Sequence, residues 1–185
     1  NPSFPVWSAD SLGFTMSHAY VQKTAVNANE VIADEIIPKE FIPEDFFNGN
    51  LKASGMFIDR FGNVQKRFSA DVKCEAANDG FVLKEHFTFD DGKKETRIWN
   101  IKRTSDKSYV GLTDDVHKQA RGTLTEIGLL WRYDFYLELF GRRVLVNFND
   151  KMIMQSSEVV LNHATISKFG FKLGELFISF HRGQK

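Results

Sequence analysis

The sequence has one cysteine, Cys74, few prolines and no excess of either charge. The single cysteine excludes an intramolecular disulfide and a cysteine-based metal site. A formal net charge of zero argues against a nucleic-acid-binding protein, which normally carries a basic excess. No apolar run approaches the roughly 18 residues that a transmembrane helix needs. The chain begins at Asn1 with neither a basic segment nor an apolar core, so we expect a processed form whose targeting segment is gone.

Recognisable catalytic and cofactor-binding motifs are also missing. The glycines are scattered, without a phosphate-binding loop, a dinucleotide fingerprint or a nucleophile elbow. No spacing typical of a zinc site joins the histidines, which occupy positions 18, 86, 117, 163 and 181. The acidic pairs Asp90-Asp91 and Asp114-Asp115 fall where turns are expected, and turn chemistry explains them. We therefore expect no catalytic residue, no metal, no cofactor and no enzymatic activity.

Phenylalanine is unusually abundant, with 18 residues against 3 tryptophans and 4 tyrosines. Its side chain buries a large apolar area and has no polar group. So many phenylalanines need either a large apolar interior or an exposed apolar surface. At 185 residues the chain is long enough for one domain with a substantial core, and short for two.

The first forty residues differ from the rest. Three of the four prolines interrupt residues 1–40, which lack a sustained hydrophobic period. The segment nevertheless carries the aromatic residues Phe4, Trp7, Phe14 and Tyr20. That is too many for a purely disordered tail. We therefore expect an N-terminal arm over residues 1–40, which packs on a partner protein or on the rest of the chain, and a second unit over residues 41–185.

From Asn50 onward the sequence predicts β-strands. Short segments rich in Val, Ile, Phe, Tyr and Thr alternate with Gly, Asn and Asp about every ten residues, as in all-β barrels and sandwiches. Every connection is too short for a parallel crossover, so the strands are antiparallel and follow one another. Closing the sheet removes two long edges, which favours an up-and-down antiparallel barrel. The predicted strands are 51–60, 64–75, 80–89, 93–103, 107–113, 118–127, 129–140, 143–155, 158–168 and 173–182.

Alternation along the strands identifies the side chains that face the interior. One inward row consists of Leu129, Trp131, Tyr133, Phe135, Leu137 and Leu139, and another of Leu83, Glu85, Phe87 and Phe89. A third is assigned to Val159, Leu161, His163 and Thr165, although Val160 and Ile166 make its facing ambiguous. Before the first strand, residues 42–47 predict a short turn or helix that inserts Phe46 and Phe47 into the body.

One pair of charged residues stands out on an inward row. Asp90-Asp91-Gly92 predicts a three-residue hairpin loop with glycine in the left-handed conformation. That register places Glu85 opposite Arg97 and Phe87 opposite Glu95. A buried Glu–Arg pair is costly unless both partners are satisfied. The pair either fixes the register of the sheet, or forms the polar end of a ligand pocket in which Arg97 binds a carboxylate or phosphate. A register slip of one residue would instead send it to solvent.

Residues 46–182 resemble a bacterial family of unknown function, DUF3833, many of whose members are predicted lipoproteins. The resemblance rests on motifs that occur in the same order, namely Phe46-Phe47-Asn48-Gly49, Gly55-Met56-Phe57-Ile58-Asp59-Arg60, Arg67-Phe68, Glu85-His86-Phe87-Thr88-Phe89-Asp90-Asp91-Gly92, Arg97-Ile98-Trp99, Tyr109-Val110-Gly111, Asp115-Val116, Trp131-Arg132-Tyr133, Leu161-Asn162 and Ser167-Lys168-Phe169-Gly170. The chain departs from the family at Phe148-Asn149-Asp150-Lys151-Met152, where members carry a stretch like Asp-Asp-Trp. It also lacks the N-terminal cysteine that carries their lipid. The resemblance implies a barrel like those of lipocalins and fatty-acid-binding proteins, and an extracytoplasmic location in the periplasm or cell envelope.

Two functions from different classes are compatible with this sequence. The first is a lipocalin-like domain, not an enzyme, that binds an apolar or amphipathic lipid-like molecule. The ligand would contact the aromatic residues Phe87, Trp99, Trp131, Tyr133 and Phe135, with Glu85 and Arg97 at its polar end. The second is an accessory subunit of a larger, membrane-associated complex. In this case the barrel of the subunit is filled by its own side chains, and residues 1–40 dock on a partner. The subunit would then lie in an organelle lumen or at the periphery of the membrane complex. A third, an isomerase or hydrolase, needs an acid or base in the cavity, and only Glu85 qualifies.

Overall fold

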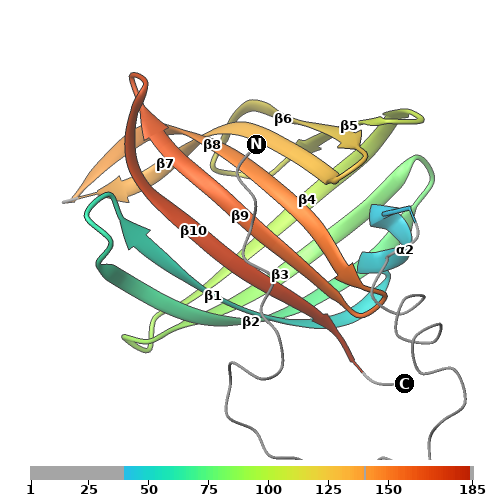
Figure 1. The fold of residues 1–185 in the computed structure, drawn as a ribbon, viewed down its shortest axis with the longest axis horizontal. Coiled ribbons are helices and arrows are strands. Elements are labelled where there is room, and N and C mark those ends of the chain that lie inside the picture. The colour runs from blue at the N-terminus through green and yellow to red at the C-terminus, as the bar shows by residue number, and fades with distance from the viewer. Residues whose placement is uncertain (1–39, 140, 184–185) are drawn as a thin grey trace, which may run out of the picture. The chain divides into compact units, whose positions relative to one another are not determined.

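The structure, a computed structural model, describes residues 40–139 and 141–183, and residues 1–39 of the predicted arm lie outside them. Ten antiparallel strands close into a barrel, in the order β1-β10-β9-β8-β7-β6-β5-β4-β3-β2 (Figure 1). The short helix α2 (Pro43–Phe47) precedes them. The strands are β1 (Gly49–Asp59), β2 (Val64–Ala77), β3 (Gly80–Phe89), β4 (Lys94–Ser105), β5 (Ser108–Leu112), β6 (Val116–Thr125), β7 (Gly128–Leu139), β8 (Arg142–Ser156), β9 (Val159–Lys168) and β10 (Phe171–Arg182).

The strand order confirms the predicted up-and-down barrel. Each strand pairs with its sequence neighbour, and β1 closes the barrel by pairing with β10 from Leu51↔Arg182 to Asp59↔Gly174. The predicted strand limits are correct to within a few residues. Consecutive strands run in opposite directions, so the β1–β2, β3–β4, β5–β6, β7–β8 and β9–β10 turns lie at one end of the barrel. No helix in the described part of the chain is long and apolar enough to cross a membrane.

Helix α2 covers the opposite end of the barrel. Pro43 occupies the first turn of the helix, where its fixed φ and missing N–H cost nothing. Phe46 and Phe47 are almost fully buried. The Phe47 ring packs against Phe81 of β3 at 6.3 Å and against Phe180 of β10 at 5.3 Å. As predicted, this segment inserts two phenylalanines into the body.

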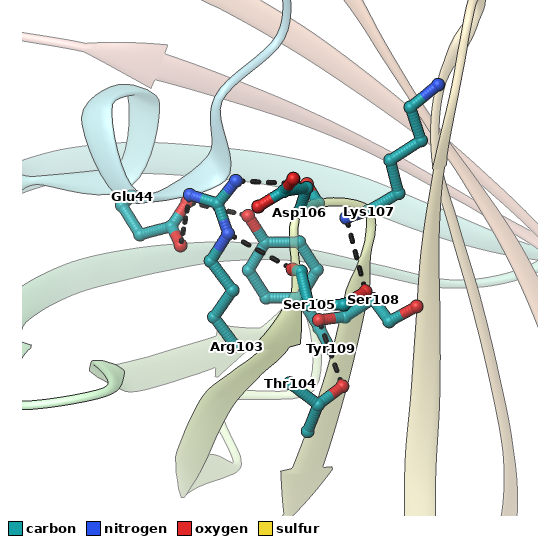
Figure 2. Close-up of polar contacts among 8 residues, drawn as sticks. All are labelled: Glu44, Arg103, Thr104, Ser105, Asp106, Lys107, Ser108 and Tyr109. Atoms are coloured by element: carbon teal, nitrogen blue, oxygen red, sulfur yellow. Dashed lines mark hydrogen bonds and ion pairs between the residues drawn. The ribbon is translucent and has the colours of Figure 1, made fainter.

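A polar contact fastens α2 to the β4–β5 hairpin (Figure 2). The Tyr109 hydroxyl donates a hydrogen bond of 2.8 Å to Glu44 Oε2. Burial and this bond raise the pKa of Tyr109, so the phenol keeps its proton and remains a donor. Arg103 lies 3.8 Å from the other Glu44 oxygen, while its Nε and Nη2 donate to the backbone carbonyls of Ser105 and Asp106. The hairpin thus positions the arginine that faces Glu44.

Two glycines make room for a tryptophan in the barrel wall. Trp131 of β7 pairs with Gly122 of β6, and its indole also lies against Gly111 of β5. A Cβ atom at either glycine would approach the Trp131 ring to 2.5 Å, well inside van der Waals contact. Because no side chain projects from these positions, the indole lies flat against two strands.

Replacing Gly122 with alanine is expected to lower the free energy of unfolding by about 1–3 kcal/mol, because the added methyl group must displace Trp131. Urea denaturation followed by tryptophan fluorescence measures the change. The matched control is Gly183→Ala, since a Cβ there meets nothing within 4 Å, and it should change stability by less than about 0.5 kcal/mol. Equal stability of the two variants would contradict a tight contact at Gly122.

Candidate functional site

The barrel is hollow. The described residues enclose a cavity of about 840 Å³, with Pro43 and Phe47 of α2 among its lining at one end. At the other end the lining includes charged residues in or close to the turns, among them Lys66, Lys93, Glu138 and Arg143, which lie at the mouth. A volume of this size is typical of small-molecule sites. The cavity therefore opens at the end opposite α2.

All seven residues predicted to contact a ligand line this cavity. They are Glu85, Phe87, Arg97, Trp99, Trp131, Tyr133 and Phe135. Six of them are buried, and Arg97 is half-buried. The structure thus brings them together around one space, while their role in binding stays a prediction.

The aromatic side chains pack edge to face along one wall. Trp99 contacts Trp131 at 5.7 Å and Tyr133 at 5.3 Å between ring centroids. Tyr133 stacks on Phe148 at 4.9 Å with nearly parallel rings, and Phe135 meets both at steep angles. Such contacts fix the rings relative to one another. The wall therefore presents a rigid apolar surface to the cavity.

The predicted register of the β3–β4 hairpin is confirmed, with Glu85 opposite Arg97 and Phe87 opposite Glu95. A direct ion pair between these two residues is not confirmed. Among the described residues no salt bridge joins Glu85 to Arg97. The guanidinium instead lies over the rings of Phe135 at 4.7 Å and Phe87 at 5.3 Å. The long arginine side chain reaches past its strand partner toward β7, where cation–π contacts stabilise it.

Glu85 is fully enclosed, and the cost of burying a charge raises the pKa of its carboxyl. The positive charge of Arg97 and the nearby Trp99 side chain oppose this effect. Burial acts most strongly, so the carboxyl holds its proton to higher pH than an exposed glutamate does. Glu85 is therefore a polar group in an otherwise aromatic region of the cavity.

The structure adds two residues that sequence reasoning missed, Asp150 of β8 and Asn162 of β9. Both are buried and line the cavity. The Asn162 amide donates a hydrogen bond of 3.2 Å to Asp150 Oδ2. Asp150 Oδ1 and Asn162 Oδ1 have no hydrogen-bond partner among the described residues. An isolated buried acceptor is costly, so this pair is a polar site held inside an apolar wall.

Burial raises the pKa of Asp150 to about 7. The Asn162 amide and the Arg97 charge hold it lower than burial alone would, and the Glu85 charge raises it. A carboxyl with this pKa exchanges its proton near neutral pH. Glu85, Arg97 and Asp150 thus form one electrostatically coupled group within the cavity.

An inward row on β8 could have revealed Asp150. Residues 146, 148, 150 and 152 alternate with exposed ones, and Asp150 interrupts an otherwise apolar series. The facing assigned to β9 was wrong, because Val160, Asn162, Ala164 and Ile166 point inward. His163 instead pairs with Glu175 at 2.9 Å. The aliphatic residues on both faces of β9 gave no clear alternation.

A hollow up-and-down barrel with a coupled polar group on its inner wall defines the fold class of this protein. Comparison by sequence then identifies the family. The chain belongs to DUF3833, a family of proteins of unknown function, whose profile matches residues 21–182. No curated protein is significantly similar to the chain.

Two solved structures are similar to this barrel. The S-type phycobiliprotein lyase from Guillardia theta has a TM-score of 0.56 at 10% identity, over 77% of this chain and 93% of the lyase. A redesigned β-barrel, mFAP1, bound to DFHBI, has a TM-score of 0.41 at 10% identity, over 74% of this chain and 95% of the designed one. At this identity the likeness to the lyase shows a shared fold and nothing further.

The comparison corrects the expectation that this protein is not an enzyme. That expectation rested on missing motifs and on the barrel type, yet the similar barrel is named as a lyase. Missing motifs are a weak argument here, because side chains from separate strands can form a site without any local pattern. Asp150 also corrects the view that Glu85 is the one acid in the cavity.

Asp150→Asn is expected to remove part of the pH dependence of stability. Between the ordinary value of 3.8 and about 7, the folded protein holds the Asp150 proton and the unfolded chain does not. The free energy of unfolding of the wild type should therefore rise as the pH falls from 8 to 5, by about 2 kcal/mol more than that of Asp150→Asn. Urea denaturation at each pH measures it.

Groups that do not interact with Asp150 behave alike in both proteins and cancel in this difference. The control is Asp106→Asn, an exposed carboxyl in the β4–β5 turn, whose pH dependence should follow that of the wild type. Parallel curves for the wild type and Asp150→Asn would show that the Asp150 carboxyl titrates as an ordinary aspartate.

Proposed function

We propose that this protein binds an amphipathic small molecule inside its barrel. The observation that carries the proposal is the cavity of about 840 Å³, which has aromatic walls and the coupled group of Glu85, Arg97 and Asp150. A barrel filled by its own side chains would have favoured a purely structural role.

The accessory-subunit alternative depends on residues 1–39, which lie outside the described residues. An extracytoplasmic location, expected from the family, stays a prediction.

The arrangement of the walls supports a particular ligand chemistry. An aliphatic or aromatic body would lie against Trp99, Trp131 and Phe135, where burial of apolar area stabilises it by about 25 cal/mol per Å². Its polar end would contact Arg97, whose guanidinium forms no salt bridge with a described residue. Asp150 in its neutral form adds a donor beside it. A chain with a carboxylate or similar acceptor at one end fits both features.

A second candidate is chemistry on the bound molecule. Asp150 has a pKa of about 7 and lines the cavity, as a general acid or base would. The similar fold of a protein named as a lyase is compatible with this candidate. Binding and proton transfer would then use the same cavity, with Asp150 as the proton carrier.

Dodecanoic acid is a suitable probe for the binding site. We expect it to displace anilinonaphthalene sulfonate from the full chain, followed by the fluorescence of that dye. Leu176→Trp narrows the cavity and should weaken dodecanoate binding at least tenfold, or about 1.4 kcal/mol. Arg97→Met should weaken dodecanoate by a similar factor and leave dodecanol unchanged, because only the carboxylate loses a charged partner.

The matched control for the cavity variant is Leu112→Trp, at an exposed position outside the cavity lining. It should bind dodecanoate as the wild type does. Equal weakening by Leu112→Trp and Leu176→Trp would mean that the probe binds elsewhere. No displacement by dodecanoic acid or dodecanol would argue against an amphiphile site.

The chemistry candidate has its own test. Molecules that co-purify with the wild type and with Asp150→Asn are extracted into organic solvent and compared by mass spectrometry. Proton transfer by Asp150 predicts that the variant retains a precursor whose mass or isomer differs from the molecule found with the wild type. The same molecule on both proteins would favour binding alone.

A further inference from the structure

Three exposed phenylalanines gather beside the mouth of the cavity. Phe61 lies in the β1–β2 turn, Phe169 lies in the β9–β10 turn and Phe171 is the first residue of β10, with 75%, 85% and 75% of their surface exposed. The two turns are neighbours, because β1 pairs with β10 and the Arg60 N–H donates to the Leu173 carbonyl at 3.0 Å. Figure 1 shows both turns at the end of the barrel away from α2. Together they form an aromatic patch.

Phe169 has an unfavourable backbone conformation and an unfavourably exposed side chain. It has a φ of +51° and Gly170 a φ of +81°, as in a two-residue type I′ turn. The first position of such a turn favours asparagine or glycine, and a bulky residue there is strained. The side chain gains no burial in return. A bulky aromatic group held outward at a strained position indicates a contact that the isolated chain does not supply.

Two cations lie over rings of the patch. The Arg60 guanidinium lies 4.6 Å from the Phe61 ring centroid, and the Lys168 ammonium lies 4.9 Å from that of Phe169. The acid in the β1–β2 turn, Asp59, stays ionised because hydrogen bonds lower its pKa. Asp59 accepts hydrogen bonds from the backbone of Phe61 and Asn63 and so shapes the β1–β2 turn. Two of the three phenylalanines, Phe61 and Phe169, are therefore accompanied by a cation.

Around the rest of the mouth the charges are of both signs. The β3–β4 turn carries Asp90 and Asp91 beside Lys93, and the β5–β6 turn carries Asp114 and Asp115. Lys66 pairs with Asp91 at 3.4 Å, and Arg143, just after the β7–β8 turn, pairs with Asp115 at 3.1 Å. Among the described residues of this end, the β1–β2 and β9–β10 turns are where exposed phenylalanines lie beside cations, so this side of the mouth would face an anionic surface.

We propose that this aromatic patch docks the barrel on an anionic lipid surface, with the cavity mouth beside the membrane. Aromatic rings insert favourably at the headgroup level of a bilayer, and Arg and Lys nearby interact with anionic lipids. The patch lies at the rim of the mouth, so docking would place the opening where an amphiphile leaves or joins the bilayer. The contact is peripheral and reversible, because three rings insert and no helix does.

Vesicle co-sedimentation of the full chain tests this docking without any cavity ligand. The wild type should bind vesicles of phosphatidylcholine with phosphatidylglycerol and bind pure phosphatidylcholine at least tenfold more weakly. Phe61→Ser, Phe169→Ser and Phe171→Ser combined should lower the partition coefficient on anionic vesicles at least tenfold. Ile127→Ser, at an exposed position in the β6–β7 turn at the other end, is the matched control and should bind as the wild type does.

A single variant separates docking from folding. Phe169→Asn supplies the residue that a type I′ turn favours, so it should raise Tm by about 2–4 °C while weakening binding to anionic vesicles. Loss of both stability and binding would show that Phe169 is a structural residue. Arg60→Gln with Lys168→Gln should remove the preference for anionic lipid.

Three results would overturn the proposal. One is a wild type that does not bind anionic vesicles, and another is a triple variant that binds them unchanged. The third is a lipid-free dimer of the wild type in sedimentation velocity that the triple variant loses, which would assign the patch to a second copy of the chain. Dodecanoate displacement on the same variants is independent, so failure of ligand binding and failure of docking are distinguishable.

Discussion

The pairing of β1 with β10 is the constraint on which the rest of the structure depends. It turns a meander of ten strands into a closed sheet in which no strand has a free edge. Closure also gives every strand an inside and an outside, so the period of two along the chain becomes a cavity wall and a solvent face. The cavity exists because the barrel is wide enough that the inward side chains do not meet at its centre. Its polar residues are then exposed to one another across that space and not only along one hairpin.

The cavity shows what a period of two in the sequence can and cannot predict. The β3–β4 register followed from a turn of known geometry, which is why the positions of Glu85 and Arg97 were correct. The predicted contact between Glu85 and Arg97 was not correct, because Arg97 interacts with Phe135 on β7, three strands further round the barrel. Turn chemistry fixes neighbours within a hairpin. Contacts across a lumen depend on its width and on side-chain length, which no local pattern encodes.

Asp150 and Asn162 illustrate the same limit from another side. Each lies on an inward row, but a single polar residue in a row of apolar ones resembles a break in the pattern. Their burial and their mutual hydrogen bond, which only the folded barrel shows, distinguish these two residues. The pKa of Asp150 depends on groups from β3, β4, β7 and β9, and so on the closed barrel as a whole. Its near-neutral value is a property of the fold and not of the residue.

Helix α2 limits the paths by which a molecule could enter or leave the cavity. The helix covers one end of the barrel, with Phe47 against Phe81 and Phe180 and with Glu44 fastened to Tyr109. A ligand of the proposed kind would then enter and leave by the same opening, because α2 covers the other end. Whichever end of the ligand leads on entry would lie nearest α2, and release would reverse the path of entry.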